Sequence, residues 1–294
     1  MTSLPRTLAK SRNIQHSDEP LGPLAELLGT WAGGEGWNLI AVPDPSGKEP
    51  FLLKIAPYFE TLTFKRLVQP IPNKGSGKLQ LVHGIEYSLT IADKENNQPL
   101  HAETGMWIIM DKPEDHDLPI ARQTIVPHGN SILAMGNFSR NQGSPQIGDI
   151  CTLPHNDGFD LQACGVASNR NSYSEPYFTA MEEFKGRFDV FNPNATLRKA
   201  IKEQEIVGTT TLAVSTKQQG GLVNIPYIVK EADASLFESV FWIETVRSVN
   251  ESGEATEFKQ LQYSQNTLLD FLTSPSTGET IRWPHVTINT LVQQ

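Results

Sequence analysis

Three histidines lie among apolar or aromatic residues, and their side chains are the best suited to chemistry: His83, His101 and His285. A neutral imidazole binds metal ions, transfers protons near neutral pH and forms hydrogen bonds when it is buried. Taken alone, each of the three is more simply a hydrogen-bonded core histidine than a ligand. The histidines in polar surroundings are His16, His116, His128 and His155; of these, His128 lies in a predicted hairpin turn, Pro127-His128-Gly129-Asn130, which could reach a binding site.

His101 and Glu103 are two residues apart in a segment with strand character, so both side chains face the same side of the strand. A histidine beside a carboxylate could carry out acid–base catalysis without a cofactor. His101-Ala102-Glu103 also matches the start of a zinc deaminase signature, but the Pro-Cys-x-x-Cys half is absent. The chain also lacks Gly-x-Ser-x-Gly, His-Glu-x-x-His and Gly-Lys-Ser/Thr, so the commonest hydrolase, peptidase and nucleotide-binding classes have no support.

The glycine cluster Gly33-Gly34-Glu35-Gly36 could expose backbone amides to an anion, but no helix start follows it. Trp37, Leu39 and Ile40 follow instead, which is typical of a strand. The cluster therefore predicts a bulged or sharply bent first strand rather than a phosphate site.

The two cysteines, Cys151 and Cys164, are too few for a disulfide framework, and their spacing is not that of a metal knuckle. We expect free thiols at both positions.

The chain has 294 residues, a net charge of −9 and a pI near 5.3. Clustered Lys and Arg, which nucleic-acid binding requires, are not found. The first residues lack the pattern of a secretory signal, and the longest apolar runs are only a few residues. The sequence therefore predicts a cytoplasmic protein that binds neither nucleic acid nor a membrane.

The elements that must position these residues are mostly strands, because a period of two dominates from Phe51 onward. The clearest case is Leu79 to Ile91, whose apolar face includes His83. Other strand-like runs are 52–56, 58–64, 101–110, 122–126, 131–135, 209–214, 223–229, 239–246, 257–269 and 283–291, separated by turn-rich stretches such as 70–77, 93–99, 217–221 and 250–253. This pattern predicts an all-β sandwich or barrel.

Three segments break this pattern. Residues 1–19 are polar and aperiodic, which predicts a flexible N-terminal tail. Leu24, Leu27 and Leu28 follow Pro23 at helical spacing and end at Gly29, which predicts a short helix covering one end of a barrel. From about 137 to 205 the alternation is lost, and Leu197, Ala200 and Ile201 follow a possible N-cap, Asn194; we expect an insertion with short helices in a single domain of residues 20–294.

Three separated segments together resemble the nitrobindin family: Leu27-Leu28-Gly29-Thr30-Trp31, Pro99 to Gly105, and Trp283-Pro284-His285-Val286. The resemblance implies an antiparallel up-and-down β-barrel of the calycin type, similar to lipocalins and fatty-acid-binding proteins, that holds haem b. It implies His285 as the iron ligand, with His101 and Thr30 on the distal side. The implied activities are binding of nitric oxide and isomerisation of peroxynitrite to nitrate.

The chain departs from this family where Trp37 to Pro43 follow the glycine cluster, and in its long insertion, so it resembles a longer, divergent branch. Two alternatives stay open: a metal-free carrier or sensor of an apolar small molecule, and a cofactor-free enzyme that uses His101 with Glu103. In each case the partner is a small-molecule ligand in the barrel cavity. Formation of a homodimer is also left open.

Overall fold

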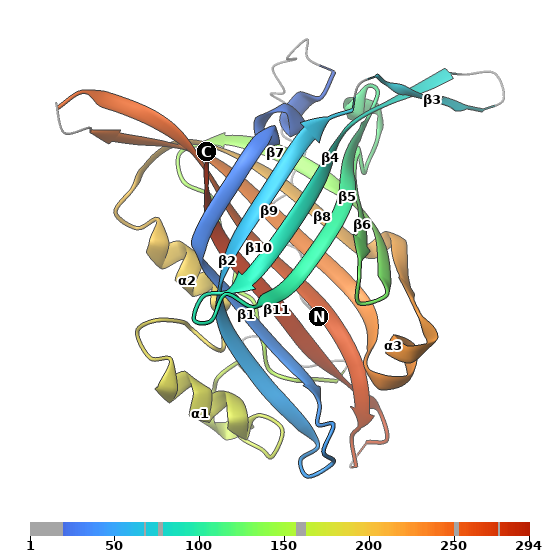
Figure 1. The fold of residues 1–294 in the computed structure, drawn as a ribbon, viewed down its shortest axis with the longest axis vertical. Coiled ribbons are helices and arrows are strands. Elements are labelled where there is room, and N and C mark those ends of the chain that lie inside the picture. Colours follow the sequence, from blue (N-terminus) through green and yellow to red (C-terminus); the bar gives the residue numbers. More distant parts are fainter. Residues whose placement is uncertain (1–19, 68, 76–78, 157–162, 250–252, 276) are drawn as a thin grey trace.

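The chain folds into a closed antiparallel β-barrel. The computed structural model describes residues 20–67, 69–75, 79–156, 163–249, 253–275 and 277–294. In these residues eleven strands form one sheet, in the order β2-β1-β11-β10-β9-β8-β7-β6-β5-β4-β3. Pairing between β2 and β4 closes the sheet, and short β3 pairs with β4 beside the barrel (Figure 1). The predicted up-and-down barrel is confirmed, since neighbouring barrel strands follow one another along the chain.

The strands are long, and the helices are short. In chain order the elements are η1 (Gly22–Leu27), β1 (Gly29–Pro43), β2 (Phe51–Arg66), β3 (Ile71–Lys74), β4 (Leu79–Asp93), β5 (Pro99–Met110), η2 (Pro113–Asp115), β6 (Ile120–Val126), β7 (Asn130–Gln142), η4 (Ala167–Asn169), α1 (Glu175–Glu183), α2 (Pro193–Ala200), β8 (Glu205–Asn224), α3 (Pro226–Glu231), β9 (Asp233–Val249), β10 (Ala255–Thr273) and β11 (Thr280–Gln293). None of the helices in these described ranges is long and apolar enough to span a membrane.

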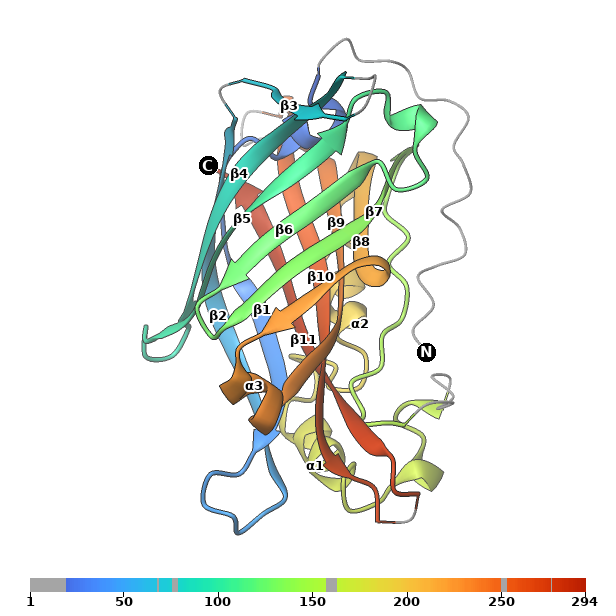
Figure 2. The same ribbon diagram turned by 90° about the vertical axis from the view of Figure 1, so that its right-hand side faces the viewer.

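One end of the barrel is covered by η1, a short 3-10 helix that lies at the upper end in Figures 1 and 2. Its Leu24 and Leu27 side chains are fully buried in the barrel interior. The Trp31 indole nitrogen donates a hydrogen bond of 2.7 Å to the Leu27 carbonyl oxygen and thereby ties η1 to β1. The predicted apolar cap over one barrel end is therefore present, which leaves the opposite end as the place for a site.

The glycine cluster shapes the first strand as predicted. The pairing of β1 with β2 shifts register between Gly33 and Gly36, which is a bulge or irregularity. A Cβ atom on Gly33 would lie 2.3 Å from the Thr290 carbonyl oxygen of β11, so only glycine fits this close backbone approach.

Residues between β7 and β8 form an excursion that packs on the outer face of the barrel. Figure 1 places α1 and α2 outside β1 and β11. Apolar side chains of the excursion and of the outer strand faces share a second core, separate from the interior: among them are Leu39, Val286, Ile288, Tyr177, Ala180, Leu197 and Ile201. β7 continues to Gln142, so the loss of alternation at about 137 precedes the end of the strand by several residues.

The prediction of free thiols is wrong. Cys151 and Cys164 form a disulfide bond within the excursion. The spacing of the two cysteines does not match a metal site, but one isolated disulfide does not require the several cysteines of a disulfide-rich domain. Only the folding of the excursion brings the two side chains together.

Other local predictions also differ from the structure. Residues 226–229 belong to helix α3, although their β-branched composition predicted a strand. Residues 217–221 predicted a turn but continue β8, which pairs with β7 through a register shift. Asn192, rather than Asn194, precedes α2, because Pro193 occupies the first helical position. The tail predicted at 1–19 lies outside the described residues.

Candidate functional site

At the end of the barrel opposite η1, here called the open end, the inward-facing side chains are only partly buried. On β1, β10 and β11 these side chains are Asn38, Ile40, Gln265, Thr267, His285 and Thr287. Their neighbours on the outer face are buried beneath the excursion, with Leu39, Val286 and Ile288 at 0% exposure. The usual burial pattern is thus reversed here, because water reaches the inside of the barrel and not the outside.

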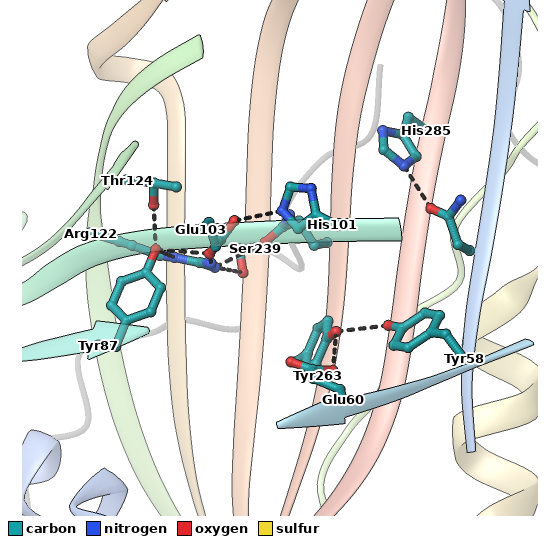
Figure 3. A network of polar contacts seen from close by, with 12 residues as sticks. Tyr58, Glu60, Tyr87, His101, Glu103, Arg122, Thr124, Ser239, Tyr263 and His285 are labelled. Atoms are coloured by element: carbon teal, nitrogen blue, oxygen red, sulfur yellow. Dashed lines mark hydrogen bonds and ion pairs between the residues drawn. The ribbon is translucent and has the colours of Figure 1, made fainter. Parts of the chain in front are cut away.

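His285 lies on the inner face of this open end. Its Nε2 atom is 2.7 Å from the Oδ1 atom of Asn38 on the neighbouring strand (Figure 3). Since an amide oxygen only accepts, Nε2 carries the proton and donates, and the Nδ1 lone pair stays free. The barrel wall around the ring, and after it the charges of His101 and His128, lower the pKa of His285 to about 3. His285 as a residue is partly exposed, and with this lowered pKa its imidazole is neutral at pH 7.

His101 lies at the same end of the barrel, on β5. Its ring stacks on that of His128 with 5.5 Å between the centroids, so the β6–β7 turn brings a second imidazole to the site. His101 Nε2 is 3.3 Å from Glu103 Oε2. Three histidines from separate parts of the sequence therefore gather at the open end, since His101 and His128 both act on the pKa of His285.

Glu103 belongs to a buried ionic network with Arg122. The two side chains, each 2% exposed, form an ion pair on the inner faces of β5 and β6. Burial raises the pKa of the Glu103 carboxyl, but Arg122, His101 and Tyr87 together outweigh it and lower the pKa to about 2. Arg122 also donates to Tyr87, Ser239 and Gln265. Glu103 is therefore an ionised, fully engaged carboxylate.

A second buried cluster surrounds Glu60 of β2, beside the first network (Figure 3). Tyr263 Oη lies 2.7 Å from Glu60 Oε2, and Asn289 Nδ2 donates to the same oxygen at 2.8 Å. The other carboxyl oxygen, Oε1, is buried without a hydrogen-bond partner. Burial, opposed by these hydrogen bonds, raises the pKa of Glu60 to about 7.

A hollow of about 600 Å³ lies at the rim of the open end. This volume is within the range of small-molecule sites, roughly 300–1,000 Å³. Its lining includes inward-facing residues such as Glu60, Ile91 and His101 and outward-facing residues such as Thr90 and Ala102, with His128 beside them. The hollow thus crosses the rim of β2, β4 and β5 rather than lying wholly inside the barrel.

The structure does not bring Thr30 to this site. Trp31 faces the interior, and Thr30 points away from it, with its hydroxyl 3.3 Å from that of Thr63 on β2. His83 is also distant. It pairs with Ile109, whereas Ile91, eight residues further along β4, pairs with His101. At about 3.3 Å per residue, His83 lies roughly 26 Å along β4 from Ile91, the strand partner of His101.

The residues at this end are compatible with a haem iron. Among the described residues no group of three or more His, Cys, Asp or Glu side chains could hold a metal ion. A haem iron needs only one protein donor, because the porphyrin supplies the other four nitrogen ligands. The imidazole of His285, in contact with Asn38, is of the chemical type that can serve as such a donor, and metal-binding histidines usually have a hydrogen-bond partner of this kind.

A protein-family model matches the N-terminal part of the barrel. Residues 20–153 match the model of the THAP4-like, heme-binding beta-barrel domain. The resemblance to the nitrobindin family is thereby confirmed for this part of the chain, which spans η1 to β7 and includes His101 and Glu103. His285 lies outside the matched residues.

Two further comparisons were made. The crystal structure of Rv2717c from M. tuberculosis aligns over 94% of this chain and 98% of that chain, with 14% sequence identity and a TM-score of 0.44. No curated protein matches this chain.

Within the matched residues, nothing in the sequence indicated a role for Asn38, Glu60 and Arg122. Asn38 and Arg122 lie in alternating segments that favour strands, but nothing in the alternation shows that they face the interior. Glu60 stands between Phe59 and Thr61, an ordinary surface pattern. The one available signal for an inward-facing carboxyl is that Glu60 alternates with Tyr58 and Leu62, so it lies on the same strand face as these apolar residues.

Proposed function

We propose that this barrel binds haem b in its open end, with the imidazole of His285 as the iron ligand. The observation that carries the proposal is a neutral imidazole, on a partly exposed residue of the inner face, in a barrel whose first seven strands match a heme-binding family. Asn38 orients that imidazole through the contact of 2.7 Å. Iron that is bound within haem needs no second ligand from the protein.

A bound haem b would supply a ferric iron that acts as a Lewis acid, able to bind nitric oxide and to isomerise peroxynitrite to nitrate. Side chains of the protein would hold and orient a small ligand beside the haem. Because Glu103 is an ionised acceptor, His101 donates a proton from Nε2 to Glu103, which leaves Nδ1 as the ring nitrogen for contact with a small ligand. Thr30, which faces outward, has no part in this site.

The alternatives differ in their support. A metal-free carrier of a small molecule would use the same open end. Binding of a small molecule by the protein in the absence of hemin would distinguish this alternative from haem binding. A cofactor-free reaction on His101 and Glu103 has less support, because the lowered pKa of Glu103 makes its carboxylate a weak base near neutral pH. The disulfide is the kind of bond that oxidising compartments preserve, so a cytoplasmic localisation stays a prediction.

The proposal predicts that hemin binds at one equivalent and that His285→Ala removes this binding. The substitution deletes the iron ligand but little packing, so the circular-dichroism spectrum should stay native. Absorbance titration with hemin should give a saturable, shifted Soret band in the wild type and in His101→Ala. Added imidazole should partly restore the band in His285→Ala.

The matched control is His83→Ala, which removes a histidine at the far end of the barrel and should leave hemin binding unchanged. Absence of a saturable band in the wild type would refute haem binding. An unchanged band and affinity in His285→Ala would mean that another residue ligates the iron.

A further inference from the structure

The buried cluster around Glu60 contains more hydrogen bonds than its hydroxyl protons can supply. Three contacts run in series: Glu60 Oε2 to Tyr263 Oη at 2.7 Å, Tyr263 Oη to Tyr58 Oη at 2.7 Å, and Tyr58 Oη to the Ile288 carbonyl oxygen at 3.0 Å. Each contact needs one proton between its two oxygens. The two tyrosines provide only two, and the carbonyl provides none.

The missing proton must therefore come from Glu60. When the carboxyl is protonated on Oε2, Glu60 donates to Tyr263, Tyr263 donates to Tyr58, and Tyr58 donates to Ile288. When Glu60 is ionised, Tyr263 must turn its proton toward the carboxylate, and the single proton of Tyr58 can then serve either Tyr263 or Ile288, so one of these two contacts is lost. The observed geometry favours the neutral acid, as does the burial of Oε1 without a partner.

The charges around Glu60 agree with this assignment. Arg122 and Glu103 are the charged groups near it, and they are paired with each other, so Arg122 offers little net charge to a second carboxylate. His101 is engaged with Glu103, and His285 is neutral. An ionised Glu60 would thus leave one uncompensated negative charge inside the barrel.

We propose that Glu60 is held as a neutral carboxylic acid and is the proton-exchange group of the barrel's open end. Its proton completes the chain that ends on Ile288 of β11, the strand that also carries His285. Glu60 lies on the lining of the rim hollow with His101 and His128, close enough to the site for its charge to matter to a ligand. The neutral form favours anionic ligands, and loss of the proton opposes them.

Infrared titration of the protein without hemin tests the protonation state directly. A buried protonated carboxyl has a carbonyl stretching band distinct from that of carboxylates. We expect such a band at pH 6 that disappears as the pH rises through about 7, the range in which Glu60 titrates. Glu60→Gln should remove the part of this band that comes from Glu60. Tyr58→Phe should move its midpoint to lower pH, because Tyr263 is then free to donate to the carboxylate.

The matched control is Glu244→Gln. Glu244 is also fully buried with a pKa raised to about 7, but its partner is Gln260 and it lies on the outer face of β9, away from the site. This variant should keep the Glu60 band. A spectrum at pH 6 that is identical in wild type and Glu60→Gln would overturn the proposal, and so would an unchanged midpoint in Tyr58→Phe.

The consequence for ligands rests on the proposed haem binding and is tested separately. Hemin carries two carboxylates, so its affinity should fall several-fold from pH 6 to pH 8 in the wild type. The part of this fall that is due to Glu60 should vanish in Glu60→Gln and persist in Glu244→Gln, whereas the histidines facing the site contribute equally in all three proteins. An equal fall in all three would overturn the coupling. Failure of hemin to bind at all would refute the proposed function and leave the infrared result standing.

Discussion

The orientation of His285 depends on one short contact, since Asn38 Oδ1 is the acceptor that fixes the ring and its tautomer. Asn38→Leu should therefore weaken hemin binding, by about 10- to 100-fold, the usual cost of losing such a partner of a metal ligand. Absorbance titration measures the affinity. Asn38→Asp keeps an acceptor and should bind hemin near the wild-type level. Equal affinity in Asn38→Leu and wild type would show that the contact does not orient the ligand.

The ion pair of Glu103 and Arg122 illustrates the cost of charge inside a barrel. Glu103→Gln leaves the buried guanidinium without a counter-charge, so the free energy of unfolding should fall by about 3 to 5 kcal/mol. Urea denaturation at pH 7 measures this loss. A double variant with Arg122→Met should lose less than the sum of the single changes. Additive losses would contradict a direct interaction.

The same pair sets the direction of acid sensitivity. The folded protein lowers the pKa of Glu103 from 4.5 to about 2, so the folded state holds its proton less tightly than the unfolded chain does. The stabilisation is therefore complete above about pH 4.5 and is lost as the pH falls toward 2. In Glu103→Gln this part of the acid dependence should be absent.

At the scale of elements, the excursion determines which face of β1 and β11 is buried. Leu197 of α2 and the neighbouring apolar residues cover Leu39, Val286 and Ile288 from outside. The outer face therefore supplies the packing of these strands. The inner face of these strands does not have to be apolar, so it can carry the polar, partly exposed side chains of Asn38 and His285.

The disulfide should stabilise this excursion without taking part in ligand binding. Replacing Cys151 and Cys164 by serine removes a cross-link between two residues that are 13 positions apart in the sequence. The free energy of unfolding should therefore fall by about 3 kcal/mol. Chemical denaturation measures the change, and reduction of the wild type is the control. Hemin affinity should be unchanged, because both residues lie outside the barrel. A large loss of affinity would connect the excursion to the site.

At the scale of the whole molecule, the site depends on closure of the barrel. The family match ends at residue 153, yet β1 needs β11 as its second neighbour and β7 needs β8. A chain of residues 20–153 therefore exposes two long strand edges and lacks His285. It should show no cooperative unfolding and no saturable hemin band, whereas the full chain shows both. Cooperative folding of the fragment would mean that β1 to β7 close by themselves.

The sequence by itself determined an all-β fold, the bulge at Gly33 to Gly36 and the apolar cover at Leu24 and Leu27, because alternation, glycine freedom and helical spacing are local properties. The choice of a closed barrel over a sandwich came from the family resemblance. Which face of a strand points inward is not local. The apolar residues Val286 and Ile288 would be placed inside by pattern alone, and His285 outside. The reverse holds because the excursion buries the outer face, and only the tertiary structure decides this. It also decided the outward position of Thr30, the Cys151–Cys164 bond and the meeting of His101, His128 and His285, since each depends on segments distant in the chain.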